Sequence, residues 1–164
     1  MIVVTAAADI DPLALEQQVC FALAVTNRAV LAVYRPLLEP LGLTHPKYLV
    51  MLALWDHRKA AGDDPAPMSV KQIATALQMD SATLSPMLKR LEALGLITRT
   101  RSATDERATD VELTSDGIAL RERALAIPAA VVARLGVDLP ELEQLRSALT
   151  RVNTAALAAG ALYE

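Results

Sequence analysis

The sequence predicts a mainly α-helical fold with one small β-hairpin, formed as a single domain over residues 1–164. Apolar residues make up 53% of the chain and aromatic residues only 3%, so Leu, Val, Ile and Ala must build the core. Leu and Ala are strong helix formers, and apolar residues recur at helical spacing over most of the chain. Residues 96–101 and 110–113 instead alternate as two strands do, around a polar loop.

The first half of the chain contains two predicted helices. Asp11-Pro12 is typical of a helix start, with the aspartate as cap and the proline in the first turn. We expect this helix to weaken near Pro36 and to end by Gly42. A second helix begins near Thr44, and the Gly- and Pro-rich stretch 62–67 that follows it is a loop by composition.

Two further helices are predicted after residue 113. Thr114 to Asp116 supply the cap of the first, which we expect to run to about residue 126. Pro128 interrupts its continuation. Asp138 begins a last helix that reaches about residue 159, so the C-terminal part is helical throughout.

A short helix at 70–77, capped by Ser69, a tight turn and a longer helix from Ser81 to Gly95 form a helix-turn-helix pattern. In that motif the second helix lies in the major groove of DNA, where its first residues reach base edges. Pro86 removes one backbone bond, either as a tolerated irregularity or as a helix start widened against DNA. The candidate major-groove residues are Ser81, Thr83, Ser85, Pro86, Lys89 and Arg90.

The charge distribution supports DNA binding by this segment. The chain carries a net charge of -3, which argues against indiscriminate binding of nucleic acid. Residues 81–101 contain four cations and one anion, and Arg99 and Arg101 lie on the first predicted strand. Arg107, near the tip of the hairpin, suits a narrow minor groove. We therefore expect a local basic surface on an acidic protein.

Other function classes find little support. The single cysteine excludes an internal disulfide and favours a cytoplasmic protein. No secretory signal is expected at residues 1–10, and no membrane span. Cys20, His45 and His57 lack metal-ligand spacing, so neither metal nor cofactor is expected. No catalytic constellation is visible, which argues against an enzyme and leaves a one-cysteine thiol peroxidase as a weak alternative.

Several motifs resemble the MarR family of bacterial regulators. They are the segment from Asp80 to Glu92, then Gly95-Leu96-Ile97-Thr98-Arg99, Asp105-Glu106-Arg107 and Leu113-Thr114-Ser115-Asp116-Gly117. Leu15-Glu16-Gln17-Gln18-Val19-Cys20-Phe21 and Tyr34-Arg35-Pro36-Leu37-Leu38 look like the organic-hydroperoxide-sensing OhrR branch of the one-cysteine type. The resemblance covers about residues 13–125.

The resemblance implies a homodimer with a winged helix-turn-helix lobe at 46–113. Dimerisation helices would lie at 13–45 and 114–164. It also implies a repressor that leaves a palindromic operator in double-stranded DNA when an organic hydroperoxide oxidises its cysteine. Cys20 would be that thiol and Tyr34 its hydrogen-bond partner, while His45 stands where the family commonly has a second tyrosine. Arg107 would enter the minor groove.

The sensing role of Cys20 has a geometric condition and an alternative. Cys20 and Tyr34 are 14 residues apart, which is about 21 Å along one straight helix, so Tyr34 would have to come from the partner chain. Without a second cysteine, oxidised Cys20 would have to react with a low-molecular-weight thiol or another molecule. By position alone, Cys20 is also typical of a buried apolar residue. The regulator would then be released by a small aromatic or lipophilic ligand.

Overall fold

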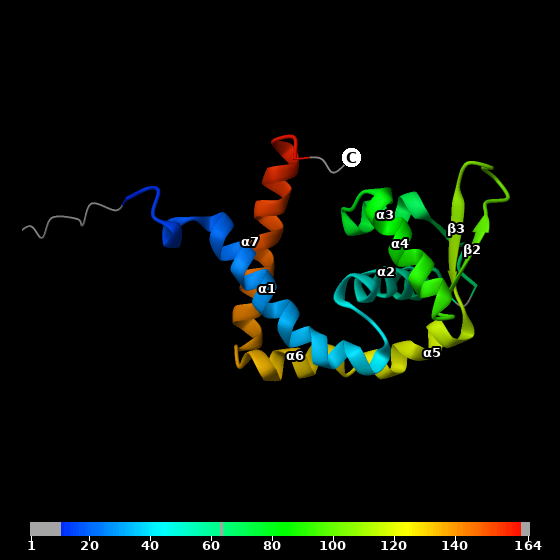
Figure 1. The fold of residues 1–164 in the computed structure, drawn as a ribbon, viewed down its shortest axis with the longest axis horizontal. Helices are drawn as coiled ribbons and strands as arrows, with labels where there is room; N and C mark the ends of the chain where they lie inside the picture. Colours follow the sequence, from blue (N-terminus) through cyan, green and yellow to red (C-terminus); the bar gives the residue numbers. More distant parts are fainter. Residues whose placement is uncertain (1–10, 63, 162–164) are drawn as a thin grey trace, which may run out of the picture.

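The computed structural model describes residues 11–62 and 64–161, and the expectation about a secretory signal at 1–10 lies outside them. The described chain is mainly helical with a small sheet (Figure 1). Its elements are α1 (Val19–Leu38), α2 (His45–Ala61), α3 (Val70–Leu77), α4 (Ser81–Ala93), α5 (Ser115–Ala124), α6 (Ile127–Leu135), α7 (Leu139–Ala158), the 3-10 turns η1 (Leu15–Gln17) and η2 (Glu39–Leu41), and strands β1 (Met68–Ser69), β2 (Ile97–Arg101) and β3 (Thr109–Leu113).

Helices α2 to α4 and the sheet form one lobe. The sheet is antiparallel in the order β1-β3-β2, with Val111 of β3 opposite Arg99 on one side and Met68 on the other. Strands β2 and β3 are the predicted hairpin, which extends as a wing beside α4 (Figure 1). The sequence pattern missed β1, because a strand of two residues shows no alternation.

The remaining helices form an arm on the other side of the molecule. Helix α1 packs on α6 and α2, and α5 joins the lobe to α6. In Figure 1 the hairpin and α7 lie at opposite sides of the molecule, with α5 and α6 along its base. Pro128 lies in the first turn of α6 and separates it from α5, as the sequence predicts.

The core lies mainly in the lobe. Leu84, Leu88 and Leu91 of α4 are buried at the predicted spacing. Trp55 of α2 is also buried, and its Nε1 donates a hydrogen bond of 2.9 Å to the carbonyl oxygen of Gly117 in α5. This bond joins the lobe to the start of the arm.

The first helix begins later than Asp11-Pro12 predicts. The side chain of Asp11 accepts a hydrogen bond from the Leu13 amide, 2.9 Å away, and closes a local turn rather than capping a long helix. Gln18 is extended, with φ -85° and ψ 120°, so α1 starts only at Val19. The expected weakening at Pro36 is also wrong, because α1 continues through it to Leu38, whose side chain is buried.

Much of the apolar surface of the arm has no cover within one chain. Among the described residues, one helical stretch, Val19–Leu41, is long and apolar enough to cross a membrane by length and composition alone, which is weak evidence. Little of it is buried. Helix α7 has no buried residue, and Leu145, Leu149 and Val152 along it are exposed. Exposed apolar patches of this kind mark interaction surfaces.

Candidate nucleic-acid interface and redox site

The start of α4 is fixed by its cap. One carboxylate oxygen of Asp80 accepts the Thr83 amide over 2.6 Å, and the other accepts the Thr83 hydroxyl over 2.7 Å. These bonds from Thr83 lower the pKa of Asp80. The hydroxyl proton of Thr83 is therefore committed to the cap, and this side chain can offer a DNA base only its acceptor electrons. Ser81, the first residue of α4, is exposed.

Pro86 lies inside α4 without ending the helix. The Ser85 hydroxyl donates a hydrogen bond of 2.9 Å to the Ser81 carbonyl in the turn just before it. At 100° per residue, Pro86 falls opposite the buried leucines with Lys89 to one side of it, and both are exposed. Arg90 is exposed at the edge of the same face. The predicted reading helix thus presents the expected cations to solvent.

Arg99 differs from the other predicted DNA-binding cations because it is paired. Its Nη2 and Nε atoms lie 2.6 Å and 3.0 Å from Oε2 of Glu92, and its amide donates to the other carboxylate oxygen over 3.2 Å. Arg99 lowers the pKa of Glu92 through these bonds. The pair fastens the first strand of the wing to the end of α4. Sequence reasoning counted Arg99 with the free cations and missed Glu92 as its partner.

Two wing arginines remain open to solvent. Arg101 ends β2, and Arg107 lies in the loop between the strands. Ser102 and Ala108 close this loop through a backbone bond of 3.0 Å, and the Arg107 amide donates to the side chain of Asp105 over 3.0 Å. The loop lies at the far end of the hairpin in Figure 1. It therefore presents Arg107 beyond the lobe.

The predicted redox residues are divided between the two ends of α1. Cys20 is exposed and is the second residue of the helix. Tyr34 is half-buried in the same helix, about 21 Å along its axis by the rise per residue. One chain therefore does not bring Cys20 and Tyr34 together.

Tyr34 and His45 do meet, at the junction of α1 and α2. Their ring centroids are 4.9 Å apart in an edge-to-face arrangement. Tyr48 lies 6.1 Å from Tyr34 and 6.4 Å from His45 and completes an aromatic cluster of these three residues. Burial lowers the pKa of His45, and burial followed by the charge of Tyr34 raises the pKa of Tyr48. The site prediction omitted Tyr48, although its place one turn after His45 was the available signal.

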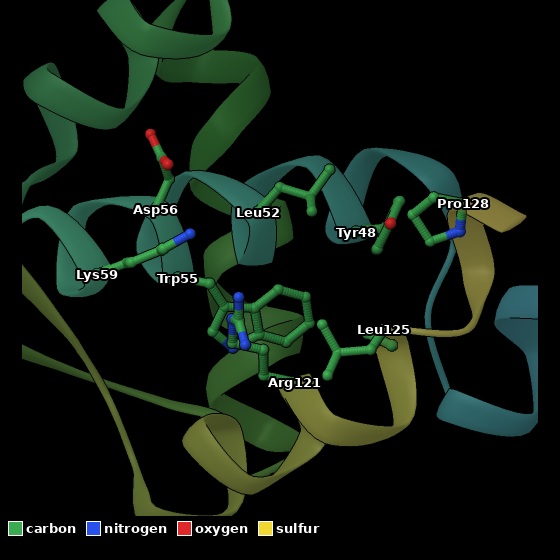
Figure 2. A pocket seen from close by; sticks show the side chains of 9 residues that line it. Tyr48, Leu52, Trp55, Asp56, Lys59, Arg121, Leu125 and Pro128 are labelled. Atoms are coloured by element: carbon green, nitrogen blue, oxygen red, sulfur yellow. The ribbon is translucent and has the colours of Figure 1, made fainter. Parts of the chain in front are cut away.

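A cavity of about 220 Å³ adjoins the aromatic cluster, because Tyr48 also forms part of its wall. Figure 2 shows Tyr48 and Pro128 at one end of it and Lys59 at the other. Trp55, Leu52 and Leu125 give it an apolar interior, with Arg121 and Asp56 among its polar lining. Its composition suits a small apolar group that carries a negative charge.

The lobe, its wing and the basic face of α4 define a winged helix-turn-helix regulator. The family model described as "Transcriptional regulator SarA/Rot" matches residues 32–123. The organic hydroperoxide resistance transcriptional regulator of Bacillus subtilis is 42% identical over 85% of this chain and 89% of its own length. The HTH-type transcriptional regulator TtmR of Methylorubrum extorquens is 39% identical over 82% of this chain and 65% of its own.

Solved structures agree with the sequence comparison. Reduced AbfR of Staphylococcus epidermidis bound to DNA is 28% identical, with a TM-score of 0.73 over 88% of this chain and 94% of that one. The chain therefore belongs to the MarR/SarA family of winged-helix transcriptional regulators. As a member of this family it is a DNA-binding transcriptional regulator.

Proposed function

We propose that this protein is a cytoplasmic repressor that leaves its operator when an organic hydroperoxide oxidises Cys20. One observation carries the proposal. The exposed thiol of Cys20 lies at one end of α1 and the aromatic cluster at the other, and the helix between them is apolar but little buried. The likeness to the Bacillus subtilis regulator supports the inducer class. The family supports α1 as a helix covered by a partner chain rather than by lipid.

Two antiparallel copies of α1 would complete the site. If the helices cross near their middle, Cys20 of each chain comes to the end that carries Tyr34 and His45 of the other. The hydroxyl of Tyr34 and the imidazole of His45 would then act as hydrogen-bond donors to the thiolate. The exposed apolar faces of α1 and α7 are the proposed dimer interface.

The chemical step is the transfer of one oxygen atom to sulfur. The Cys20 thiolate attacks the hydroperoxide, so that an S–O bond forms and the O–O bond breaks. The released alkoxide takes a proton and leaves as an alcohol, and Cys20 becomes a sulfenic acid. The late start of α1 supports this role, because Cys20 lies in the first turn, where the unpaired peptide N–H groups favour negative charge. A low-molecular-weight thiol then condenses with the sulfenic acid, so that an S–S bond forms, the S–O bond breaks and water leaves.

For DNA, we infer that the exposed face of α4 enters the major groove of a palindromic operator. Lys89, Arg90 and Arg101 would meet phosphates, and Arg107 the minor groove. Ser81, Thr83 and Ser85 would face base edges, with Pro86 against the sugar-phosphate chain or a base methyl. The role of Arg99 is different from that of Arg101, since its charge already faces Glu92.

Operator binding with and without cumene hydroperoxide tests the sensor. We expect peroxide to release wild-type protein, while Cys20→Ser keeps binding DNA under both conditions. The serine differs by one atom and keeps a donor, so the variant isolates the redox chemistry. Wild-type binding that persists in excess peroxide would contradict the proposal.

Heterodimers test whether the site is shared between chains. In one heterodimer, Cys20→Ser stands on one chain and Tyr34→Phe on the other; in the second, both substitutions stand on the same chain beside a wild-type partner. A shared site predicts rapid oxidation of the remaining Cys20 in the first and slow oxidation in the second. A site within one chain predicts the reverse order.

The cavity supports a second candidate, in which a small ligand releases the operator and Cys20 is inert. Its apolar wall and the cations Lys59 and Arg121 favour an aromatic or acyl carboxylate. Leu125→Trp would fill the cavity. Release by such a carboxylate, lost in Leu125→Trp and kept in Cys20→Ser, would establish this second function.

A further inference from the structure

We propose that Asn153 is a positioning residue for DNA recognition. Its Nδ2 donates a hydrogen bond of 2.9 Å to Oε1 of Gln78, 75 residues earlier in the chain. This contact, called here the Asn153–Gln78 bridge, ties the turn of the helix-turn-helix to α7. We infer that it sets how far apart the two recognition helices of the dimer stand. The inference rests on the proposed place of α7 in the dimer interface.

Gln78 has an unusual backbone for its residue type. It ends α3 with φ 51° and ψ 49°, the one positive φ outside glycine in the described residues. The amides of Gln78 and Met79 both bond back to the Ala74 carbonyl, which is a helix end that usually holds glycine. Glycine would adopt this conformation without steric cost, but it has no side chain for Asn153. The glutamine therefore adds a contact that the turn does not need for its own shape.

The bridge acts close to the DNA-reading residues. Gln78 is two residues before Asp80, whose carboxylate caps α4 and holds Thr83. Ser81, the first residue of α4, follows directly. A side chain that fixes Gln78 thus fixes the end of α4 that would reach the base edges.

Helix α7 has little other connection to the lobe. Its other side-chain hydrogen bonds in the described chain, from Thr150 and Thr154, return to carbonyls of the same helix. Leu149 and Val152 flank Asn153 on the helix surface and are exposed. A partner chain packed on these two residues would set the position of Asn153, and the bridge would pass that position to the turn. Asn153 belongs to the last two turns of α7, toward the C-terminal end of the helix.

The spacing of DNA half-sites is the quantity that such a bridge controls. Dimeric helix-turn-helix proteins require half-sites about one helical turn of DNA apart, because the two reading helices are held at that distance. Without the bridge, α4 would keep its cap and its core packing but lose its tie to the interface. Affinity for the preferred spacing should fall, and tolerance of other spacings should rise.

The test uses the full-length reduced dimer and a palindromic duplex that the wild-type protein selects from random DNA. Affinity is measured for this duplex and for versions with one base pair added to or removed from its centre. We expect Asn153→Ala and Gln78→Ala each to weaken binding at the native spacing by about 2- to 10-fold, the worth of one hydrogen bond. Both should also flatten the dependence on spacing, and the double variant should be no worse than either single one.

Two further variants separate positioning from stability. Thr154→Ala, the neighbour of Asn153 with a bond inside its own helix, should bind all three duplexes as the wild type does. Gln78→Gly should keep or raise the melting temperature, since glycine suits the positive φ, yet show the same loss of spacing preference. Because Gln78 lies outside α7, its variants stay informative even where Asn153→Ala weakens the dimer.

The inference fails if the Asn153 and Gln78 variants keep wild-type affinity and spacing preference, or if their effects add in the double variant. It also fails if Gln78→Gly keeps the wild-type spacing preference. No peroxide enters these measurements. A wild-type protein that never responds to peroxide would refute the redox function and leave this result unaffected.

Discussion

Gly117 offers a sharp test of how the lobe is joined to the arm. Glycine is needed there because α5 approaches the backbone of Leu96 closely, and not because of its backbone angles. A Cβ at this position would overlap the carbonyl oxygen of Leu96 and would lie 3.0 Å from its carbonyl carbon. It would also lie 3.2 Å from Cδ2 of Leu113. Alanine is the better helix former by about 1 kcal/mol, so propensity alone predicts that Gly117→Ala stabilises α5.

The overlap should outweigh this gain. Backbone shifts that relieve overpacking cost about 1–3 kcal/mol. The Leu96 carbonyl also accepts the Thr114 amide over 3.1 Å, and displacing it weakens that bond by about 1 kcal/mol. After the propensity gain, we expect Gly117→Ala to lower the free energy of unfolding by about 1–3 kcal/mol.

Urea unfolding at one fixed protein concentration measures the effect, since the stability of a dimer depends on concentration. Gly136→Ala is the matched control. Gly136 has φ 62°, and a Cβ added there would meet nothing within 4 Å, so its cost of about 1 kcal/mol comes from the backbone alone. A Gly117→Ala variant as stable as the wild type would refute the reasoning, because the close approach of α5 to Leu96 would then be absent in solution.

Two further predictions concern charge. Burial lowers the pKa of His45, so the folded state binds its proton less well than the unfolded chain; stability should be complete above pH about 6.5 and fall as pH drops below it. His45→Gln should flatten this part of the melting temperature profile, and an unchanged profile in this variant would contradict the prediction. For DNA, Arg101→Ala should reduce the salt dependence of operator binding by about two counterions per dimer, one for each chain, whereas Arg99→Ala should leave that slope nearly unchanged, because Glu92 already neutralises Arg99. Equal slopes in the two variants would show that both arginines meet phosphates.

Local signals in the sequence are sufficient to predict the two helices of the helix-turn-helix, α3 and α4. Ser69 and Gln72 form a reciprocal capping box at the start of α3, and Asp80 caps α4. Each of these bonds joins residues three apart, so the pattern is visible within one short window. The core leucines of α4 are predicted for the same reason, because their spacing alone places them on one face of the helix.

The errors come from interactions that a short window does not contain. The Asp11-Pro12 pattern suits a helix start, but the extended Gln18 delays α1 to Val19. Glu92 and Arg99 lie on different elements, and their pairing depends on how the wing folds back on α4. The redox site is a stronger case of the same limit. Tyr34, His45 and Tyr48 meet through the packing of α1 on α2, and the thiol proposed to face them belongs to a second chain.

The place of Tyr48 explains how a reaction on the arm would reach α4. Tyr48 belongs to the aromatic cluster and also lies on α2, whose buried residues Val50, Met51 and Leu54 belong to the core that α3 and α4 share. Close-packed cores do not deform gradually, so a cluster displaced by oxidised sulfur would move α2 and its neighbours together. The Asn153–Gln78 bridge would hold the same lobe from its other side. Release of DNA then requires the lobe to turn against the bridge. Loss of the bridge should therefore lower the fraction of oxidised Cys20 that is needed to release DNA. We expect this effect even where the affinity of the reduced protein for DNA falls only a few fold.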